Sequence, residues 1–182
     1  MLNDKSKQQL LRLARFSIKR HFLNDQHAVF PETLDTSLEE TLATFVTLKI
    51  NHALRGCIGN MEATSTLAES VMKNAHSAAF HDPRFAPLSE SEFTEIEISI
   101  SILNQAQPVL FSSETDLLSK LRPNIDGLVI QKGLKKATFL PAVWESLTSP
   151  EIFLSQLKHK AGINEKDCPE QAWTYQTESF SE

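Results

Sequence analysis

Apolar residues recur every three to four positions near the start of the chain, which is the spacing of one face of an α-helix. This face is formed by Leu10, Leu13, Ala14, Ile18 and Phe22. The pattern predicts an amphipathic helix over about residues 5–23 that packs by a single stripe.

Between residues 43 and 59 the pattern changes to that of a β-hairpin. Residues 43–50 are mostly apolar and rich in β-branched and aromatic types, as expected for a strand. Residues 51–53 predict a turn, after which residues 54–58 return as the partner strand. Gly56 and Gly59 permit a bulge near the end of that second strand.

A second helix is predicted after Thr66, because Glu69 follows at the spacing of an N-terminal capping box. Its apolar face carries mostly small residues, which suits close packing on a sheet, and Pro83 stops it near His81. Isoleucines at every second position between residues 96 and 102 alternate with Glu and Ser. This alternation is typical of a strand with one buried face in an antiparallel sheet.

The rest of the chain continues with the same mixture of patterns. It predicts helices that open at Ser113 and Ser149, a helix stop at Gly162, strands over residues 127–131 and 137–140, and a last strand containing Trp173 and Tyr175. Helices and strands do not alternate regularly as β-α-β units. The sequence therefore favours an α+β fold over a doubly wound sheet.

Composition narrows the class of protein. A chain of 182 residues fits one ordinary domain, and 41% hydrophobic with 23% charged residues is near the globular average. Apolar runs fall short of the ~18 residues that a membrane span needs, and the first residues are polar, unlike a signal peptide. Cys57 and Cys168 match no metal or redox spacing. We expect a cytoplasmic protein with no membrane partner.

The net charge of -5 is unevenly distributed along the chain. A basic stripe is confined to the first predicted helix, through Arg12, Arg15, Lys19 and Arg20. Nucleic-acid binders concentrate such residues on one face, so this helix is a candidate contact for an anion. A solvated helix face explains the stripe better, and the overall charge speaks against a nucleic-acid partner.

Two of the chain's five glycines fall in the run LRGCIG at residues 54–59, around Cys57. Arg55 lies in the same run, and the second predicted helix begins a few residues later. A cation and a helix N-terminus both stabilise a thiolate, so Cys57 is a candidate nucleophile, covalent carrier or redox thiol. The run alone is explained better by a buried free cysteine that packs as a small apolar side chain.

The histidines do not settle this choice. His52, His76 and His81 are each candidates for the base of Cys57, and the sequence marks none of them. His76 and His81, with Asp82 beside them, also raise the question of a metal site. Their spacing of five does not place two ligands on one helical face, which needs three or four. Phosphate-loop, nucleophile-elbow and dinucleotide motifs are absent from the sequence. We predict no metal and no cofactor.

Six blocks occur in order over about residues 5–180 and together resemble the AMMECR family. They are FVTLK at 45–49, LRGCIG at 54–59, AAFHDPRF at 78–85, DGL at 126–128, ATFLP with VW at 137–144, and FL with KAG at 153–162. Bacterial members are called AmmeMemoRadiSam system protein A, after the Memo-like and radical-SAM proteins that they accompany.

The resemblance implies a fold and partners, and it names no reaction. It implies an α+β protein with a largely antiparallel sheet flanked by helices, a larger subdomain and a smaller one. These would pack intimately within one AMMECR-like domain over residues 1–182. It also implies a Memo-like protein and a radical-SAM protein as partners. The family usually has a glycine where this chain has His52, so we expect His52 to adopt a left-handed conformation.

Cores tolerate volume-conserving swaps, so a shared six-residue run indicates a functional surface rather than packing alone. We therefore expect a small-molecule-handling protein or enzyme component with Cys57 as the reactive or substrate-contacting atom. Arg55 and Arg84 would hold a small anionic ligand, with His81 and Asp82 beside them. An ion pair between Arg84 and Asp82 is an equal alternative for that arginine.

The two glycines of the run have two candidate roles. Either they let a ligand approach the backbone closely, or they hold a positive φ in a bulge. We expect the first role to dominate at Gly56, beside the thiol, and the second at Gly59.

Two further functions remain open from the sequence. The chain could be a non-catalytic scaffold or binding module for the Memo-like and radical-SAM partners. More weakly, it could be a regulator that contacts nucleic acid through its first helix. Whether the protein is an enzyme is not decided by these residues.

Overall fold

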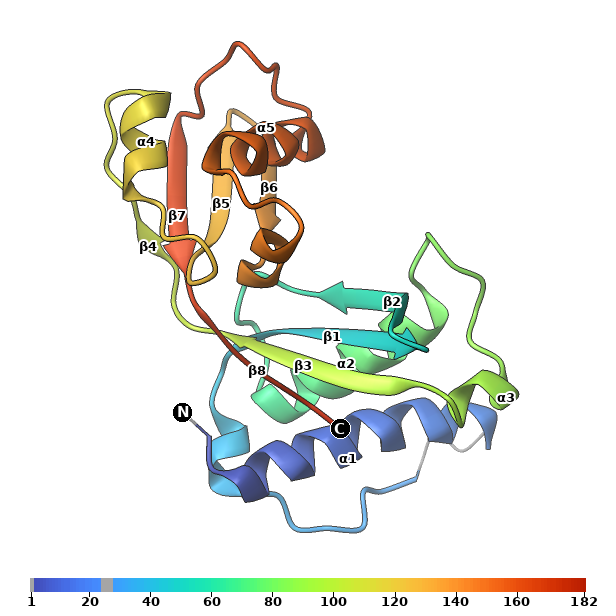
Figure 1. Cartoon of the computed structure of the whole chain (residues 1–182). Helices are drawn as coiled ribbons and strands as arrows, with labels where there is room; N and C mark the ends of the chain where they lie inside the picture. Colours follow the sequence, from blue (N-terminus) through green and yellow to red (C-terminus); the bar gives the residue numbers. More distant parts are fainter. Residues whose placement is uncertain (1, 24–27) are drawn as a thin grey trace. The chain divides into compact units, whose positions relative to one another are not determined.

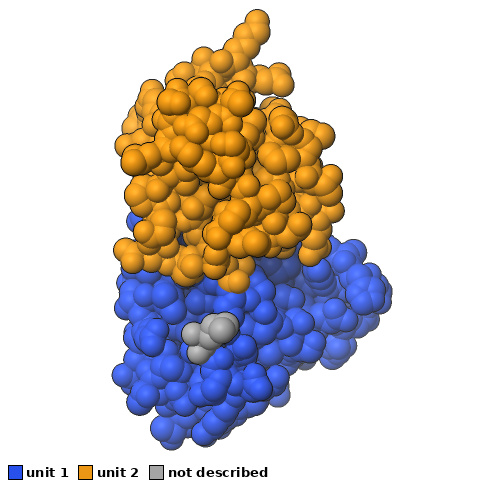
Figure 2. Space-filling model, turned by 60° about the vertical axis from the view of Figure 1, so that its left-hand side comes forward, with its two compact units in different colours: residues 1–103, 178–182 blue, residues 104–177 orange. Residues whose placement is uncertain are grey.

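The computed structural model describes residues 2–23 and 28–182, which divide into two compact units (Figures 1 and 2). Unit 1 comprises residues 1–103 and 178–182, and unit 2 comprises residues 104–177. Each unit has its own sheet and its own hydrophobic core. The predicted α+β fold with a larger and a smaller subdomain is confirmed.

Unit 1 is a four-stranded sheet in the order β2-β1-β3-β8, with helices α1 and α2 on one face (Figure 1). Its elements are α1 Asp4–Phe22, η1 Thr36–Glu39, β1 Ala43–Ile50, β2 Ala53–Gly59, α2 Leu67–Phe80, α3 Glu90–Phe93, β3 Glu97–Leu103 and β8 Thr177–Ser181. The predicted helices and hairpin are confirmed. The short elements η1, α3 and β8 were not predicted, and β8 lies beside β3 although it comes from the far end of the chain.

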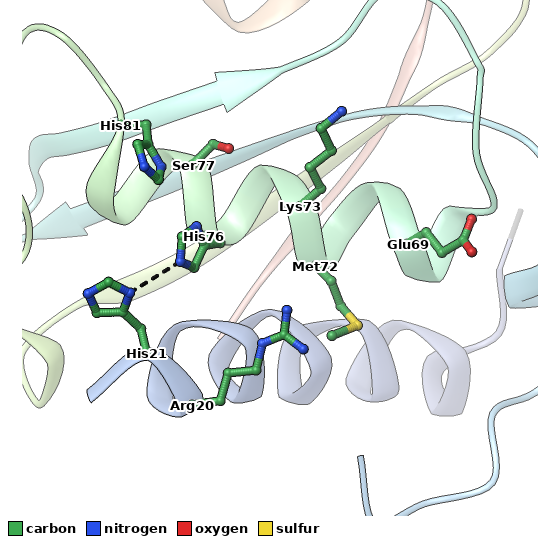
Figure 3. Close-up of a pocket in the computed structure, with 8 residues that line it drawn as sticks. All are labelled: Arg20, His21, Glu69, Met72, Lys73, His76, Ser77 and His81. Carbon is green, nitrogen blue, oxygen red and sulfur yellow. Dashed lines mark hydrogen bonds between the residues drawn. The ribbon is translucent and has the colours of Figure 1, made fainter. Parts of the chain in front are cut away.

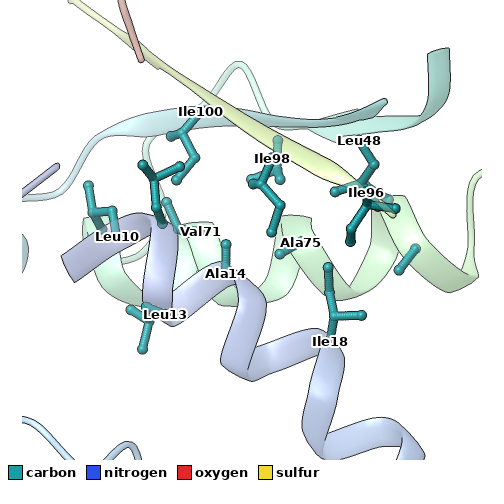
Figure 4. Close-up of a cluster of buried hydrophobic side chains, with 14 of the residues drawn as sticks. Leu10, Leu13, Ala14, Ile18, Leu48, Val71, Ala75, Ile96, Ile98 and Ile100 are labelled. Atoms are coloured by element: carbon teal, nitrogen blue, oxygen red, sulfur yellow. The ribbon is translucent and has the colours of Figure 1, made fainter. Parts of the chain in front are cut away.

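The core of unit 1 is formed where the apolar stripes of both helices meet the inner face of the sheet (Figure 4). Ala14 and Ile18 from α1 and Ala75 from α2 lie under Ile98 and Ile100 of β3, and these five side chains are almost fully buried. The 3.6-residue period of the helices and the two-residue period of the strand therefore serve one core.

The hairpin of β1 and β2 has a two-residue loop in which both residues take a positive φ, 50° at Asn51 and 63° at His52. Such turns match the twist of the paired strands. The predicted left-handed conformation of His52 is confirmed. Leu48 pairs with Gly56 and Lys49 with Leu54, so the extra residue of the bulge is Arg55.

Packing explains the two glycines of the LRGCIG run at residues 54–59, which we call the signature. A Cβ on Gly56 would lie 2.1 Å from the carbonyl oxygen of Ala78 in α2. A Cβ on Gly59 would lie 2.3 Å from the ring of Phe45, which covers this glycine. Neither glycine has a positive φ, so the expectation of a positive φ in a bulge at Gly59 is wrong. A close approach was expected at Gly56 and is present, but the group that approaches is the backbone of α2 and not a ligand.

The contact of α2 with the sheet also contains a buried polar cluster. The side-chain amide of Asn74 donates to the Thr44 carbonyl oxygen at 3.0 Å and to the side-chain oxygen of Asn60 at 2.8 Å. The Ser70 hydroxyl lies 2.8 Å from that of Thr44. Because buried polar groups are costly without partners, these bonds specify how the helix sits on β1 and on the end of β2.

Unit 2 is an antiparallel sheet in the order β4-β7-β5-β6, with two helices. Its elements are β4 Gln107–Pro108, α4 Glu114–Lys120, β5 Gly127–Lys132, β6 Lys135–Phe139, η2 Pro141–Glu145, α5 Pro150–Ala161 and β7 Gln171–Tyr175. Trp144 stacks on Phe153 in its core at a centroid distance of 3.7 Å. The predicted helix stop at Gly162 is confirmed by its φ of 72°.

We expect Gly56→Ala to lower the free energy of unfolding by about 2–3 kcal/mol, because the added methyl group must push the backbone of α2 away from β2. Urea unfolding followed by far-ultraviolet circular dichroism measures this. Gly133→Ala is the matched control: a Cβ there meets no atom within 4 Å, and only its φ of 56° causes strain, so about 1 kcal/mol is expected. Equal stabilities of Gly56→Ala and the wild type would refute the packing explanation.

Candidate functional site

Cys57 lies on β2, an edge strand of the unit 1 sheet. Successive side chains of a strand point to opposite faces. Since the Cα–H of Gly56 points to α2, the thiol of Cys57 lies on the face away from the helices. It is half-buried, and the hydroxyl of Thr47 on β1 donates to its sulfur at 3.2 Å. The strand therefore presents an ordered, partly accessible thiol.

The outer edge of β2 at Cys57 is capped by an ion pair rather than by another strand. The N–H of Cys57 donates to Oδ2 of Asp82 at 2.8 Å, and Nη2 of Arg84 donates to the carbonyl oxygen of Cys57 at 3.2 Å. Arg84 also donates to both carboxylate oxygens of Asp82, at 2.9 and 2.7 Å. The pair thus satisfies both free backbone groups of the cysteine, which would otherwise be an open pairing site.

Asp82 is the charged centre of this arrangement. It is 4% exposed, and the hydrogen bonds from Arg84, followed by those from the backbone N–H groups of Cys57 and Arg84, hold its pKa well below the ordinary value against the opposing effect of burial. The same carboxylate raises the pKa of Arg84. The side chain of Arg84 is nevertheless 54% exposed, so the alternative of an ion pair is correct and still leaves a cation at the surface.

Arg55 is more enclosed than Arg84, and its Nη1 is buried with no hydrogen-bond partner. Its guanidinium donates to the two oxygens of Glu92 at 2.7 and 3.1 Å and to the carbonyl oxygen of Ala86 at 3.0 Å. Only 14% of its side chain is exposed. This arginine, followed by hydrogen bonds from Ser89, lowers the pKa of Glu92 to about 2. Arg55 therefore ties β2 to the segment that follows α2.

The two arginines share one aromatic neighbour. The guanidinium carbons of Arg55 and Arg84 lie 5.8 and 5.5 Å from the ring centroid of Phe85. This distance is within the range of cation–π attraction. The structure thus brings four of the predicted site residues together around one strand edge: Arg55, Cys57, Asp82 and Arg84.

The two groups expected to stabilise a thiolate are not beside Cys57. α2 has 14 residues, a length of about 20 Å at 1.5 Å per residue. Cys57 contacts Asp82, just beyond the C-terminal end of that helix, and not its N-terminus. Arg55 is held by Glu92. These expectations are wrong because β2 passes the C-terminal end of α2 at Cys57. The polar side chains that contact Cys57 are Thr47, Asp82 and Arg84.

His81 is exposed and belongs to a different feature. It lines a pocket of about 630 Å³ on the helical side of unit 1 (Figure 3). The lining residues are Arg20, His21, Glu69, Met72, Lys73, His76, Ser77 and His81. Sequence reasoning missed His21, Arg20 and Lys73 as partners of His76. The only signal in the sequence was the basic end of the first helix, and its meeting with the second helix is a tertiary contact.

The basic stripe of α1 is partly neutralised. Arg12 donates to Glu32 at 2.7 Å, and Arg15 donates through Nε to Glu182 at 2.8 Å. Both acids come from other parts of unit 1. Two of the four cations on this face are therefore ion-paired within the chain. Within the described part of the chain, no helix is long and apolar enough to cross a membrane.

The fold matches a solved structure over its full length. The crystal structure of the uncharacterized protein PH0010 from Pyrococcus horikoshii superposes with a TM-score of 0.91 at 28% sequence identity, covering 100% of this chain and 93% of that one. The α+β architecture of two antiparallel sheets is thus a known arrangement.

Sequence relatives give the family. A protein of Methanothermobacter thermautotrophicus is 32% identical, with 95% of this chain and 92% of the relative covered. A protein of Sulfolobus acidocaldarius is 37% identical, with 92% of this chain and 75% of the relative covered. The AMMECR1 family model matches residues 11–180. The chain belongs to the AMMECR1 family, as its six blocks indicated.

Asp82→Asn is expected to lower the free energy of unfolding at pH 7 by about 1–3 kcal/mol, because Arg84 loses its charged partner. Since the pKa of Asp82 is lower in the folded state, its contribution is complete at neutral pH and is lost only as the pH falls below about 4. The variant should therefore lose less stability than the wild type on acidification.

Urea unfolding between pH 7 and pH 3 measures both effects. Asp167→Asn is the control, because the carboxylate of its ion pair with Lys132 is 47% exposed, against 2% for that of Asp82, and pairs near the surface contribute at most about 1 kcal/mol. Equal urea midpoints for the two variants at pH 7 would contradict the role assigned to Asp82.

Proposed function

We propose that the chain handles a small anionic molecule at the surface formed by Cys57 and Arg84, with the thiol as the contacting or reacting atom. The observation that carries this proposal is the double use of Asp82. One buried carboxylate holds the backbone of the cysteine and the guanidinium of the arginine at the same time. A partly accessible thiol and an exposed cation are thereby kept beside each other.

The roles of the two arginines differ in this proposal. Asp82 and the Cys57 carbonyl group take up Nε and Nη2 of Arg84, so Nη1 is the nitrogen that donates to the ligand. Arg55, held by Glu92 and the Ala86 carbonyl group, acts as a positioning residue for the strand. This arrangement resembles the anion-binding use of arginine at a surface, where a charged donor orients a carboxylate or phosphate.

The hydroxyl of Thr47 supports chemistry at the thiol. The hydrogen bond that this hydroxyl donates fixes the position of the sulfur. Thr47 pairs with Cys57 across β1 and β2, so the donor is positioned by sheet register and not by a flexible loop. We propose the cytoplasm as the compartment, where the free thiols Cys57 and Cys168 stay reduced.

We propose a Memo-like protein and a radical-SAM protein as partners, on the strength of the family resemblance. The alternative function is a non-catalytic binding module for these partners. One observation favours this alternative. The hydrogen bonds of Arg55 and Asp82 hold the edge of β2 in place. Titration of purified Memo-like protein with the wild type and with Cys57→Ser separates the two. A binding module keeps its affinity in the variant and shows none of the selective labelling described next.

The leading proposal predicts that thiol reagents modify Cys57 faster than Cys168 in the native protein. Burial and the charge of Glu114 raise the pKa of Cys168, so its thiolate is scarcer at pH 7. It also predicts that a negatively charged reagent modifies Cys57 faster than a neutral one does, because Arg84 attracts the negative charge. Mass spectrometry of the labelled peptides gives both rates.

Arg84→Gln should reduce the ratio of charged to neutral reagent rates at Cys57 by roughly threefold or more, equivalent to about 0.7 kcal/mol of attraction. The neutral reagent controls for changed exposure of the thiol. Lys49→Gln, an exposed lysine of β1, controls for overall charge. Equal labelling of the two cysteines, or an unchanged ratio in Arg84→Gln, would remove the support for a thiol and anion site.

A further inference from the structure

The pocket between α1 and α2 lies on the helical side of unit 1, whereas Cys57 lies on the opposite face of the sheet. Its cavity of about 630 Å³ is within the range of small-molecule sites. Arg20 and His21 come from the last turn of α1, and Lys73 and His76 come from the middle of α2 (Figure 3). Two helices thus place donors on two walls of one cavity.

The lining is rich in cations and poor in free acceptors. Arg20 and Lys73 carry permanent charges, and three imidazoles join them. The carboxylate in the lining is Glu69, which accepts from the backbone N–H of Thr66 in the capping box of α2. In Figure 3 it lies at the other end of the pocket from the histidines. The histidine end of the pocket is therefore electropositive, and its positive charge grows as the imidazoles protonate.

The imidazoles are held in fixed positions. Nε2 of His76 lies 3.3 Å from Nδ1 of His21, and the ring of His21 stacks on Phe80 at a centroid distance of 3.8 Å. The ring of His81 lies 5.3 Å from that of His76. Because the hydrogen bond needs one donor and one acceptor, a second proton on this pair breaks it. The pair can therefore carry one added proton with its hydrogen bond intact, and a second added proton needs an anion to compensate it.

The electrostatics of His76 agree with this geometry. Burial lowers its pKa, and His21, His81 and Arg20 lower it further by repulsion. An anion seated between these groups reverses the repulsion and favours protonation. We propose that this pocket is a second binding site, which takes the phosphate group of a small phosphorylated molecule. It is independent of the surface proposed at Cys57.

A phosphate fits the donors better than other ions do. Arg20 and Lys73 repel a metal cation. Phosphate oxygens spread around one atom accept from both helices at once, which a planar carboxylate does less well. The cavity of about 630 Å³ has room for more than a bare phosphate ion. Met72 provides an apolar wall for an organic group attached to the phosphate. The ligand is therefore a phosphate ester or inorganic phosphate, which the experiment separates.

Calorimetric titration of the full chain at constant ionic strength tests the proposal. Inorganic phosphate and phenyl phosphate at pH 7 distinguish free phosphate from an ester, and tighter binding of phenyl phosphate is expected. Sulfate serves for the pH series because it keeps its charge between pH 5.5 and pH 8. We expect sulfate affinity to rise about tenfold from pH 8 to pH 5.5, because imidazole is the side chain that gains charge in this range and a bound anion favours the charged form.

Variants assign the effect to the pocket. His76→Gln should reduce the pH dependence, since His21 and His81 remain in the pocket. Lys73→Gln, at an exposed position of α2, should weaken binding several-fold at every pH. His159→Gln on α5 and Lys166→Gln, both in unit 2, are the matched controls. Cys57→Ser should bind phosphate unchanged, so failure here and failure of the proposed function are distinguishable.

Several results would overturn the proposal. They are no saturable binding of phosphate or sulfate at pH 5.5, equal affinities for Lys73→Gln and Lys166→Gln, or stabilisation by Zn²⁺ with none by either anion. Circular dichroism confirms folding of each variant. Should His76→Gln fail to fold, Lys73→Gln with its control still decides the outcome.

Discussion

The buried carboxylate of Asp82 is the interaction on which the signature region of unit 1 depends. An edge strand has free N–H and C=O groups that invite pairing with another chain. Here one side chain, with the arginine that it holds, satisfies those groups at Cys57. The segment after α2 is thereby fastened to β2, and Arg55 fastens the same two segments a few residues further on through Glu92. Two ion pairs thus hold the LRGCIG run at residues 54–59 against the segment that follows α2.

The close contact between β2 and α2 separates two faces of unit 1. Gly56 brings β2 so close to α2 that a methyl group would meet the carbonyl oxygen of Ala78. On the helical side, the basic pocket lies between α1 and α2. The cysteine faces the other way, beside Thr47. One chain can thus offer two chemically different surfaces, a thiol with a single cation and a cluster of imidazoles with two cations.

Much of the local structure could be read from the sequence because it is encoded by short-range patterns. The Thr66 capping box, the isoleucine alternation of β3 and the Gly162 stop were all predicted and are present. The left-handed His52 was predicted from a single departure from the family pattern. β8 was not predicted, because its pairing with β3 links residues almost 80 positions apart.

The sequence by itself determined the fold class, the longer helices and strands, the family and the short list of residues around Cys57. It could not determine what each of those residues contacts. The roles of Gly56 and Arg55 depend on which end of α2 meets β2. The basic pocket depends on how the last turn of α1 packs beside α2. Such contacts arise from packing of distant segments, and local periodicity carries no information about them. Only the tertiary structure decides them, because burial and charge pairing are properties of neighbours in space.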